Sequence, residues 1–150
     1  MEITYIKTKQ KIYFRGADDP LKLKSIKPKF GYIGIAWYEE LDQFNGMEEI
    51  RNINQTIICG GERFNIFYTF NPPKTRDNWV NVEKLENKTG RLIHHSTYET
   101  VPREWLGNKF IEEAEYLKQT KPQAYEHEYA GSVKSPRLFR RGLIELRIGL

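Results

Sequence analysis

Apolar residues in the first half of the chain gather in short runs that stop abruptly at polar residues. The clearest run covers residues 31–38 and ends at Glu39 and Glu40. A second run covers residues 64–70 and ends at Asn71, which two prolines follow. A continuous apolar run of this length is typical of a strand that is buried on both faces of a parallel sheet. The pattern therefore predicts two interior strands, each followed by polar side chains.

Between the two runs, apolar residues recur at the three- and four-residue intervals of one helix face. These residues are Met47, Ile50, Ile53 and Ile57. After the second run, the spacing predicts a short helix, a third strand and two further helices, near residues 79–86, 91–96, 102–117 and 122–131. Strands that alternate with helices predict an α/β domain with a mostly parallel sheet flanked by helices.

The N-terminal residues have a different pattern. Residues 3–6 and 12–14 are rich in β-branched and aromatic side chains, and a polar stretch separates them. This pattern predicts a hairpin or a pair of edge strands. Asp18, Asp19 and Pro20 then predict the start of a short helix, since an acidic cap and an early proline are typical of that position.

The composition is that of a folded domain. Hydrophobic residues make up 39% and aromatic residues 13% of the 150 residues, which argues against intrinsic disorder. No apolar run approaches the roughly 20 residues that a membrane-spanning helix needs. The first residues lack the pattern of a signal peptide. A single cysteine, Cys59, excludes an intramolecular disulfide framework and the common zinc patterns. We therefore expect a soluble, cytoplasmic protein with no membrane partner.

The net charge of +4 comes from the end of the chain. Residues 1–133 hold 19 basic and 19 acidic side chains, whereas residues 134–150 hold five basic side chains and one acidic one. A nucleic-acid-binding face needs basic residues that cluster on a folded surface. We therefore expect residues 134–150 to form a solvated basic tail.

Two carboxylates at the end of the first apolar run are the strongest chemical signal. In open α/β sheets, ligands bind beyond the carboxyl ends of the strands. There Glu39 and Glu40 would divide two tasks, because successive strand residues point to opposite faces. One carboxylate would hold hydrated Mg²⁺, and the other would orient and deprotonate an attacking water. An acidic pair that simply begins a solvated loop fits the pattern about equally well.

The end of the second run gives a weaker signal. Thr69 and Asn71 are able to hydrogen-bond a γ-phosphate or a water and so to sense whether a nucleotide is intact. On pattern alone, a strand closed by an Asn-Pro turn is the better interpretation.

One pattern is absent from these residues. The phosphate loop G-x-x-x-x-G-K-[ST] supplies backbone N–H groups and a lysine to phosphates, and it occurs nowhere in the sequence. An ATPase site built around Glu39 and Glu40 would therefore lack its phosphate cradle.

Five blocks, taken together and in order, resemble the large subunit of tailed-phage terminases, in the branch common in prophages of Gram-positive bacteria. The blocks are Lys11–Pro20, Gly31–Phe44, Phe67–Pro73 with Arg76–Trp79, His94–Tyr98 and Tyr125–Tyr129. The resemblance covers nearly all of residues 3–133. It implies a P-loop-NTPase-like (ASCE) fold and the ATPase part of an ATP-driven DNA-packaging motor.

The resemblance also implies roles for the polar residues named above. Glu39 matches the Walker B acid that holds Mg²⁺, and Glu40 matches the carboxylate that activates water. Thr69 and Asn71 match the ends of the motif that couples hydrolysis to movement. The implied cofactors are ATP and Mg²⁺, and the implied partners are DNA, the portal or procapsid and the small terminase subunit.

We therefore expect residues 1–133 to be the later half of a terminase ATPase domain, without a Walker A loop. Residues 134–150 are expected to be a non-homologous or disordered tail, and no nuclease site is expected. Such a chain would be inactive alone, as a truncated prophage remnant without a cellular role or as a half enzyme that another chain completes. The alternative is a non-catalytic module that binds DNA, procapsid or small subunit. An unpaired sheet edge would favour oligomers or aggregation.

Overall fold

A computed structural model describes residues 1–16, 23 and 26–133, together with the backbone of residues 144–147. The expected helix start at Asp18–Pro20 lies outside the described residues. The strands are β1 Glu2–Thr4, β2 Lys11–Tyr13, β3 Ile35–Tyr38, β4 Asn65–Tyr68, β5 Arg91–His94 and β6 Ile144–Arg147. The α-helices in the described part are α2 Met47–Ile57, α3 Trp79–Glu83, α4 Asn108–Thr120 and α5 Pro122–Glu128. Short 3₁₀ turns lie at Leu41–Gln43, Tyr98–Thr100 and Arg103–Trp105.

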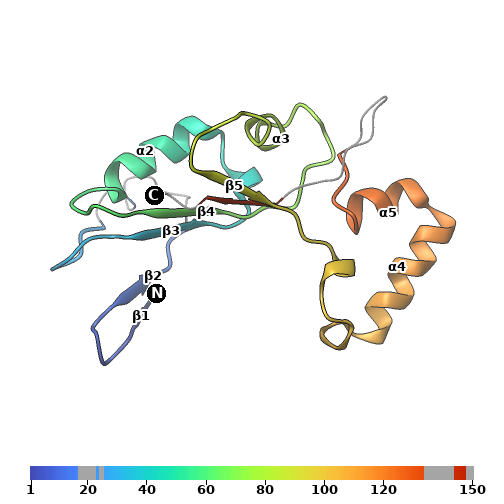
Figure 1. Cartoon of the computed structure of the whole chain (residues 1–150), viewed down its shortest axis with the longest axis horizontal. Coiled ribbons are helices and arrows are strands. Elements are labelled where there is room, and N and C mark those ends of the chain that lie inside the picture. The colour runs from blue at the N-terminus through green and yellow to red at the C-terminus, as the bar shows by residue number, and fades with distance from the viewer. Residues whose placement is uncertain (17–22, 24–25, 134–143, 148–150) are drawn as a thin grey trace.

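The strands form a two-stranded hairpin, β1–β2, and a four-stranded sheet in the order β3–β4–β6–β5 (Figure 1). β3 and β4 are parallel, whereas β6 is antiparallel to both of its neighbours. The sheet is therefore mixed rather than mostly parallel. The difference arises because Ile144–Arg147, within the segment expected to be a tail, forms the strand between β4 and β5.

The β3–α2–β4 unit contains most of the hydrophobic core. The α2 helix spans the residues that the apolar spacing predicted, and its Ile50 and Ile53 side chains are buried against the sheet. Tyr38 and Tyr68 lie on the covered face of β3 and β4. The remaining buried members of the core are Leu23, Leu41, Phe70 and Val80.

The prediction that β3 is buried on both faces is wrong. Tyr38 is only 7% exposed, but Ile35 and Trp37 are 63% and 67% exposed. Side chains alternate between the faces of a strand, and α2 and α3 both cover the same face (Figure 1). β3 is also an edge strand of the described sheet, whereas β4 lies between β3 and β6. The residues of the apolar run are therefore covered on one face of β3 and exposed to solvent on the other.

The α4 and α5 helices lie beside the sheet (Figure 1). An aromatic cluster joins them to the 3₁₀ turn at Tyr98–Thr100. Rings of Tyr98, Phe110, Tyr125 and Tyr129 pack edge to face or stacked, with centroids 5.4–6.3 Å apart. The helix predicted near residues 102–117 begins only after Gly107, because residues 103–105 form a 3₁₀ turn. No helix within the described ranges has the length and apolarity that crossing a membrane would require.

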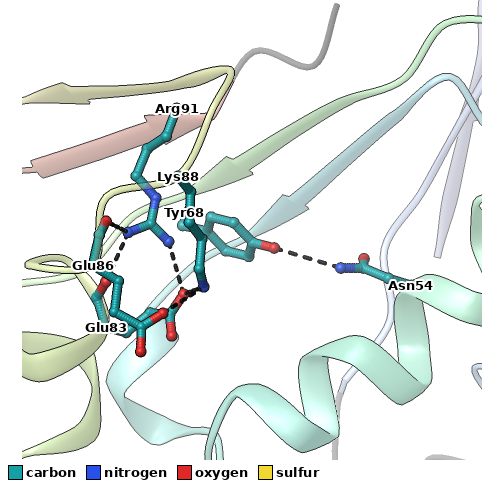
Figure 2. Close-up of polar contacts among 6 residues, drawn as sticks. All are labelled: Asn54, Tyr68, Glu83, Glu86, Lys88 and Arg91. Carbon is teal, nitrogen blue, oxygen red and sulfur yellow. Dashed lines mark hydrogen bonds and ion pairs between the residues drawn. The ribbon is translucent and has the colours of Figure 1, made fainter.

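Charged side chains connect the end of α3 to the start of β5 (Figure 2). The Arg91 guanidinium donates to the Glu83 carboxylate and to the Glu83 carbonyl, at 2.7 Å each, and to the Glu86 carbonyl at 3.0 Å. Lys88 also donates to the Glu83 carboxylate. Burial alone would raise the pKa of Glu83, but the hydrogen bonds and charges of Lys88 and Arg91 outweigh it and hold that pKa below its ordinary value of 4.5.

The Glu83→Gln variant tests this cluster, because it keeps the side-chain shape and removes the charge. We expect it to lower the free energy of unfolding by about 1–3 kcal/mol near neutral pH, since charged hydrogen bonds become neutral ones. The pKa of Glu83 is lowered by folding, so its stabilising effect is present above pH 4.5 and is lost as the pH falls through the folded-state pKa. Urea titrations across this pH range should show the difference between the two proteins shrinking on acidification.

Glu86→Gln is the matched control for that experiment. The Glu86 side chain is 54% exposed and contacts Lys88 at 3.1 Å, so its loss should change stability by less than about 1 kcal/mol. A Glu83→Gln difference that stays constant down to acidic pH would contradict the assignment of the charge effect to Glu83.

Candidate functional site

The two predicted site segments leave the sheet at the same edge. β3 and β4 pair in parallel, with Tyr38 opposite Tyr68 as the last pair of the register. Glu39 and Glu40 follow β3, and Thr69 and Asn71 follow β4. The parallel register thus brings the acidic pair and Thr69 to the carboxyl ends of adjacent strands, where open α/β sheets bind ligands.

Backbone hydrogen bonds of Thr69 lie on both sides of the acidic pair. The Thr69 N–H donates to the Tyr38 carbonyl at 2.9 Å, and the Leu41 N–H donates to the Thr69 carbonyl at 3.0 Å. Glu39 and Glu40 are the two residues between these attachment points. Asn71 is exposed, and its side chain has no hydrogen bond within the described ranges. The structure therefore connects the acidic pair with Thr69 and not with the Asn71 side chain.

Glu40 has a left-handed backbone conformation, with φ 50° and ψ 52°. In the described part of the chain, Lys9 is the other non-glycine residue with positive φ. This conformation costs an ordinary L-residue roughly 1–2 kcal/mol, because Cβ approaches the following carbonyl. The Gln43 N–H donates to the Glu40 carbonyl at 2.9 Å, and the Gln43 side-chain amide contacts the Glu40 carboxylate. The strain therefore lies at the residue predicted to activate water.

Two buried tyrosines at the strand ends share a hydrogen-bond partner on α2, the half-buried Asn54. The Tyr38 hydroxyl donates to Asn54 Oδ1 at 2.7 Å, and Asn54 Nδ2 donates to the Tyr68 hydroxyl at 3.5 Å; the second contact is drawn in Figure 2. The two tyrosine rings stack with centroids 5.4 Å apart. Burial, with a smaller contribution from Tyr68, raises the pKa of Tyr38, so its hydroxyl stays protonated. Asn54 lies on α2, so this group fixes the helix to the last residues of both strands.

Two tryptophans near the site were missed by the sequence analysis. The Trp37 indole N–H donates to Thr69 Oγ1 at 2.9 Å, and the Trp79 indole N–H donates to the Phe44 carbonyl at 2.8 Å. Trp37 thereby orients the Thr69 hydroxyl, and Trp79 holds the segment that follows the acidic pair. No sequence signal marks either contact, because both residues read as ordinary apolar positions.

The donor set at this edge fits one kind of metal. Glu39 and Glu40 are both exposed, and the described residues contain no group of three or more His, Cys, Asp or Glu side chains placed to hold a metal ion. Mg²⁺ is commonly bound by one or two carboxylates, with water and phosphate oxygens completing the shell. The two glutamates fit that arrangement, whereas a protein-only metal cage does not.

Comparisons with known proteins agree with the sequence resemblance. The family model described as phage terminase large subunit matches residues 1–132. A relative named "Terminase, large subunit", from Bacillus phage SPP1, is 40% identical over 140 residues. That match covers 87% of this chain and 32% of the relative, so the chain spans about a third of the relative's length.

The backbone strain at Glu40 can be measured by substitution with glycine. We expect Glu40→Gly to raise the free energy of unfolding by about 1 kcal/mol, because glycine adopts positive φ without a steric penalty. Urea denaturation of the whole chain measures the change. Glu39→Gly is the control: Glu39 does not have positive φ, so the added freedom of the unfolded chain should leave that variant unchanged or less stable. Equal destabilisation by both substitutions would contradict strain at Glu40.

Proposed function

This chain belongs to the family of phage terminase large subunits, and we propose that residues 1–133 carry the later half of the family's ATPase domain, with a P-loop-NTPase-like fold. The family match over residues 1–132 supports this assignment. The β3–α2–β4 unit supports it as well, because two parallel strands present polar residues at one edge of the sheet. ATP hydrolysis would then serve DNA packaging, with the portal or procapsid and the small subunit as further partners.

In this proposal the acidic pair divides the chemistry. Glu39 provides the carboxylate for Mg²⁺, and Glu40 orients the attacking water and accepts its proton. ATP would be the phosphoryl donor, and Mg²⁺ held at Glu39 would offset the negative charge that develops on the phosphate oxygens. The exposed carboxylates and the strained backbone at Glu40 support these roles, because strain of this kind clusters at functional positions.

Thr69 and Asn71 form the sensing and coupling segment in this proposal. The observation that carries it is the pair of Thr69 backbone hydrogen bonds on either side of Glu39 and Glu40. A displacement of the acidic pair would pass directly to Thr69 and then along the chain to Asn71. Trp37 orients the Thr69 hydroxyl and is a positioning residue.

The 150 residues alone are proposed not to turn over ATP, because they contain no G-x-x-x-x-G-K-[ST] loop. A chimera provides the direct test: this chain replaces the matching segment of the SPP1 large subunit. We expect the chimera to hydrolyse ATP and Glu40→Gln to slow hydrolysis by about 10²–10⁴-fold, the usual contribution of a general base. Phosphate release in the absence of DNA is the measurement.

Glu48→Gln is the matched control in the chimera. Glu48 lies exposed in the first turn of α2, so its replacement should leave the hydrolysis rate unchanged. Glu39→Gln should slow hydrolysis and raise the Mg²⁺ concentration needed for half-maximal rate. A folded chimera in which Glu40→Gln and Glu48→Gln hydrolyse ATP equally well would refute the assignment, and ATP turnover by the unmodified chain alone would refute its proposed inactivity.

A further inference from the structure

Residues 1–133 are neutral in sum, but their charges are unevenly distributed. Residues 1–30 hold eight basic and three acidic side chains, a net charge of +5. Residues 31–133 hold 11 basic and 16 acidic side chains, a net charge of −5. The described part of the positive segment includes the β1–β2 hairpin, whose residues 1–16 hold four basic side chains and one acidic side chain.

The hairpin projects from the body of the molecule (Figure 1). Its strands pair with Glu2 opposite Tyr13 and Thr4 opposite Lys11. The Tyr5 N–H donates to the Gln10 carbonyl, and the Lys9 N–H donates to the Tyr5 carbonyl, both at 2.8 Å. The turn between these residues carries Lys7 and Lys9 at the end of the ribbon, and both are exposed.

The cations of the hairpin differ in how far they are neutralised. Lys11 pairs with Glu2 at 2.8 Å, so its charge is partly offset. The Arg15 guanidinium lies 5.5 Å from the centre of the Tyr13 ring and donates to the carbonyls of Phe14 and Met1. Neither contact offsets its charge. Lys7 and Lys9 have no carboxylate partner within the described ranges, so the strongest uncompensated charge lies at the tip.

Lys11 and Tyr13 share one face of β2 with Thr4 and Glu2, which lie opposite them on β1, and the Arg15 guanidinium lies over the Tyr13 ring. Ile3 and Ile12 lie opposite each other on the second face, so the ribbon has a charged, aromatic side and an apolar side. A two-stranded ribbon fits the major groove of B-DNA, which is about 12 Å wide. Exposed lysines without carboxylate partners bind phosphates and release counterions.

We infer that the β1–β2 hairpin is a DNA-binding element, in which Lys7, Lys9 and Arg15 contact the phosphate backbone of duplex DNA without reading its sequence. The inference rests on the proposed function, which makes DNA a partner, and it adds where this chain contacts DNA. The net charge of −5 makes residues 31–133 unfavourable for phosphate on average, so these residues would not compete with the hairpin for DNA.

The test is the salt dependence of DNA binding by the whole chain. Binding of a fluorescently labelled duplex is measured by anisotropy between about 50 and 200 mM salt. The double variant Lys7→Gln with Lys9→Asn removes two charges, and Asn tolerates the positive φ of 63° at residue 9. The loss of two phosphate contacts should make the slope of log K against log salt shallower by about 1.8. The control, Lys74→Gln with Lys121→Asn, removes two exposed lysines elsewhere and should leave the slope unchanged.

Circular dichroism establishes that both double variants are folded. Equal slopes for the hairpin variant and the unmodified chain would overturn the inference. So would equal losses in the hairpin and control variants, since net charge alone would then explain binding. Capture of the chain by anionic phospholipid vesicles without duplex binding would overturn it in favour of a membrane surface. The chimera assay measures phosphate release without DNA, so failure here is distinguishable from failure of the proposed ATPase role.

Discussion

The parallel register of β3 and β4 is the constraint on which the candidate site depends. It places Tyr38 opposite Tyr68, and everything that follows either strand emerges at one edge. A slip of one residue would turn Tyr38 to the wet face and separate it from Asn54, because side chains alternate with a period of two. The hydrogen bonds between half-buried Asn54 and the buried hydroxyls of Tyr38 and Tyr68 therefore favour this register. Since a buried hydroxyl or amide without a partner costs roughly 1–3 kcal/mol, the slipped arrangement is strongly disfavoured.

The same constraint explains how strain at Glu40 persists. The chain is fixed before the acidic pair by the Thr69 N–H bond to Tyr38, and after it by the Leu41 N–H bond to Thr69. Leu41 is only 1% exposed, so its burial prevents the loop from relaxing outward. Burying a leucine side chain contributes about 1.5–3 kcal/mol, which is enough to offset the cost of one left-handed residue. The two backbone hydrogen bonds and the burial of Leu41 therefore hold the backbone of Glu40 in its strained conformation.

Local patterns in the sequence predicted those parts of the fold that depend on local spacing. The intervals between Met47 and Ile57 predicted α2, because one apolar face of a helix leaves a periodic trace. The position of β6 between β4 and β5 left no such trace, since pairing between distant segments has no local periodicity. The apolar run of β3 likewise did not reveal that Ile35 and Trp37 face solvent, because a strand covered on one face and a strand covered on both can share this composition.

In the candidate site, too, features that depend on neighbouring residues were predicted, whereas contacts between distant residues were not. A polar residue after an apolar run is visible in the sequence, and so Glu39, Glu40, Thr69 and Asn71 were predicted as candidates from it. The Trp37 bond to Thr69 joins residues 32 positions apart and requires the register to be known first. Backbone strain at Glu40 was equally invisible, because glutamate carries no preference for positive φ.

The proposed function requires one small chain to bind both a cation, Mg²⁺, and a polyanion, DNA, and its charges are distributed unevenly along the sequence. Residues 31–133, which include the proposed Mg²⁺-binding carboxylates, have a net charge of −5. The same charge repels DNA, so a contact with DNA needs cations held away from that surface. Screening reduces interactions between exposed charges beyond about 10 Å at 0.1 M salt. Strands rise about 3.3 Å per residue, so the three-residue strands β1 and β2 place Lys7 and Lys9 about 10 Å from the base of the hairpin. In the proposed function, the projecting hairpin would thus hold the DNA-binding lysines away from the negative charge of residues 31–133.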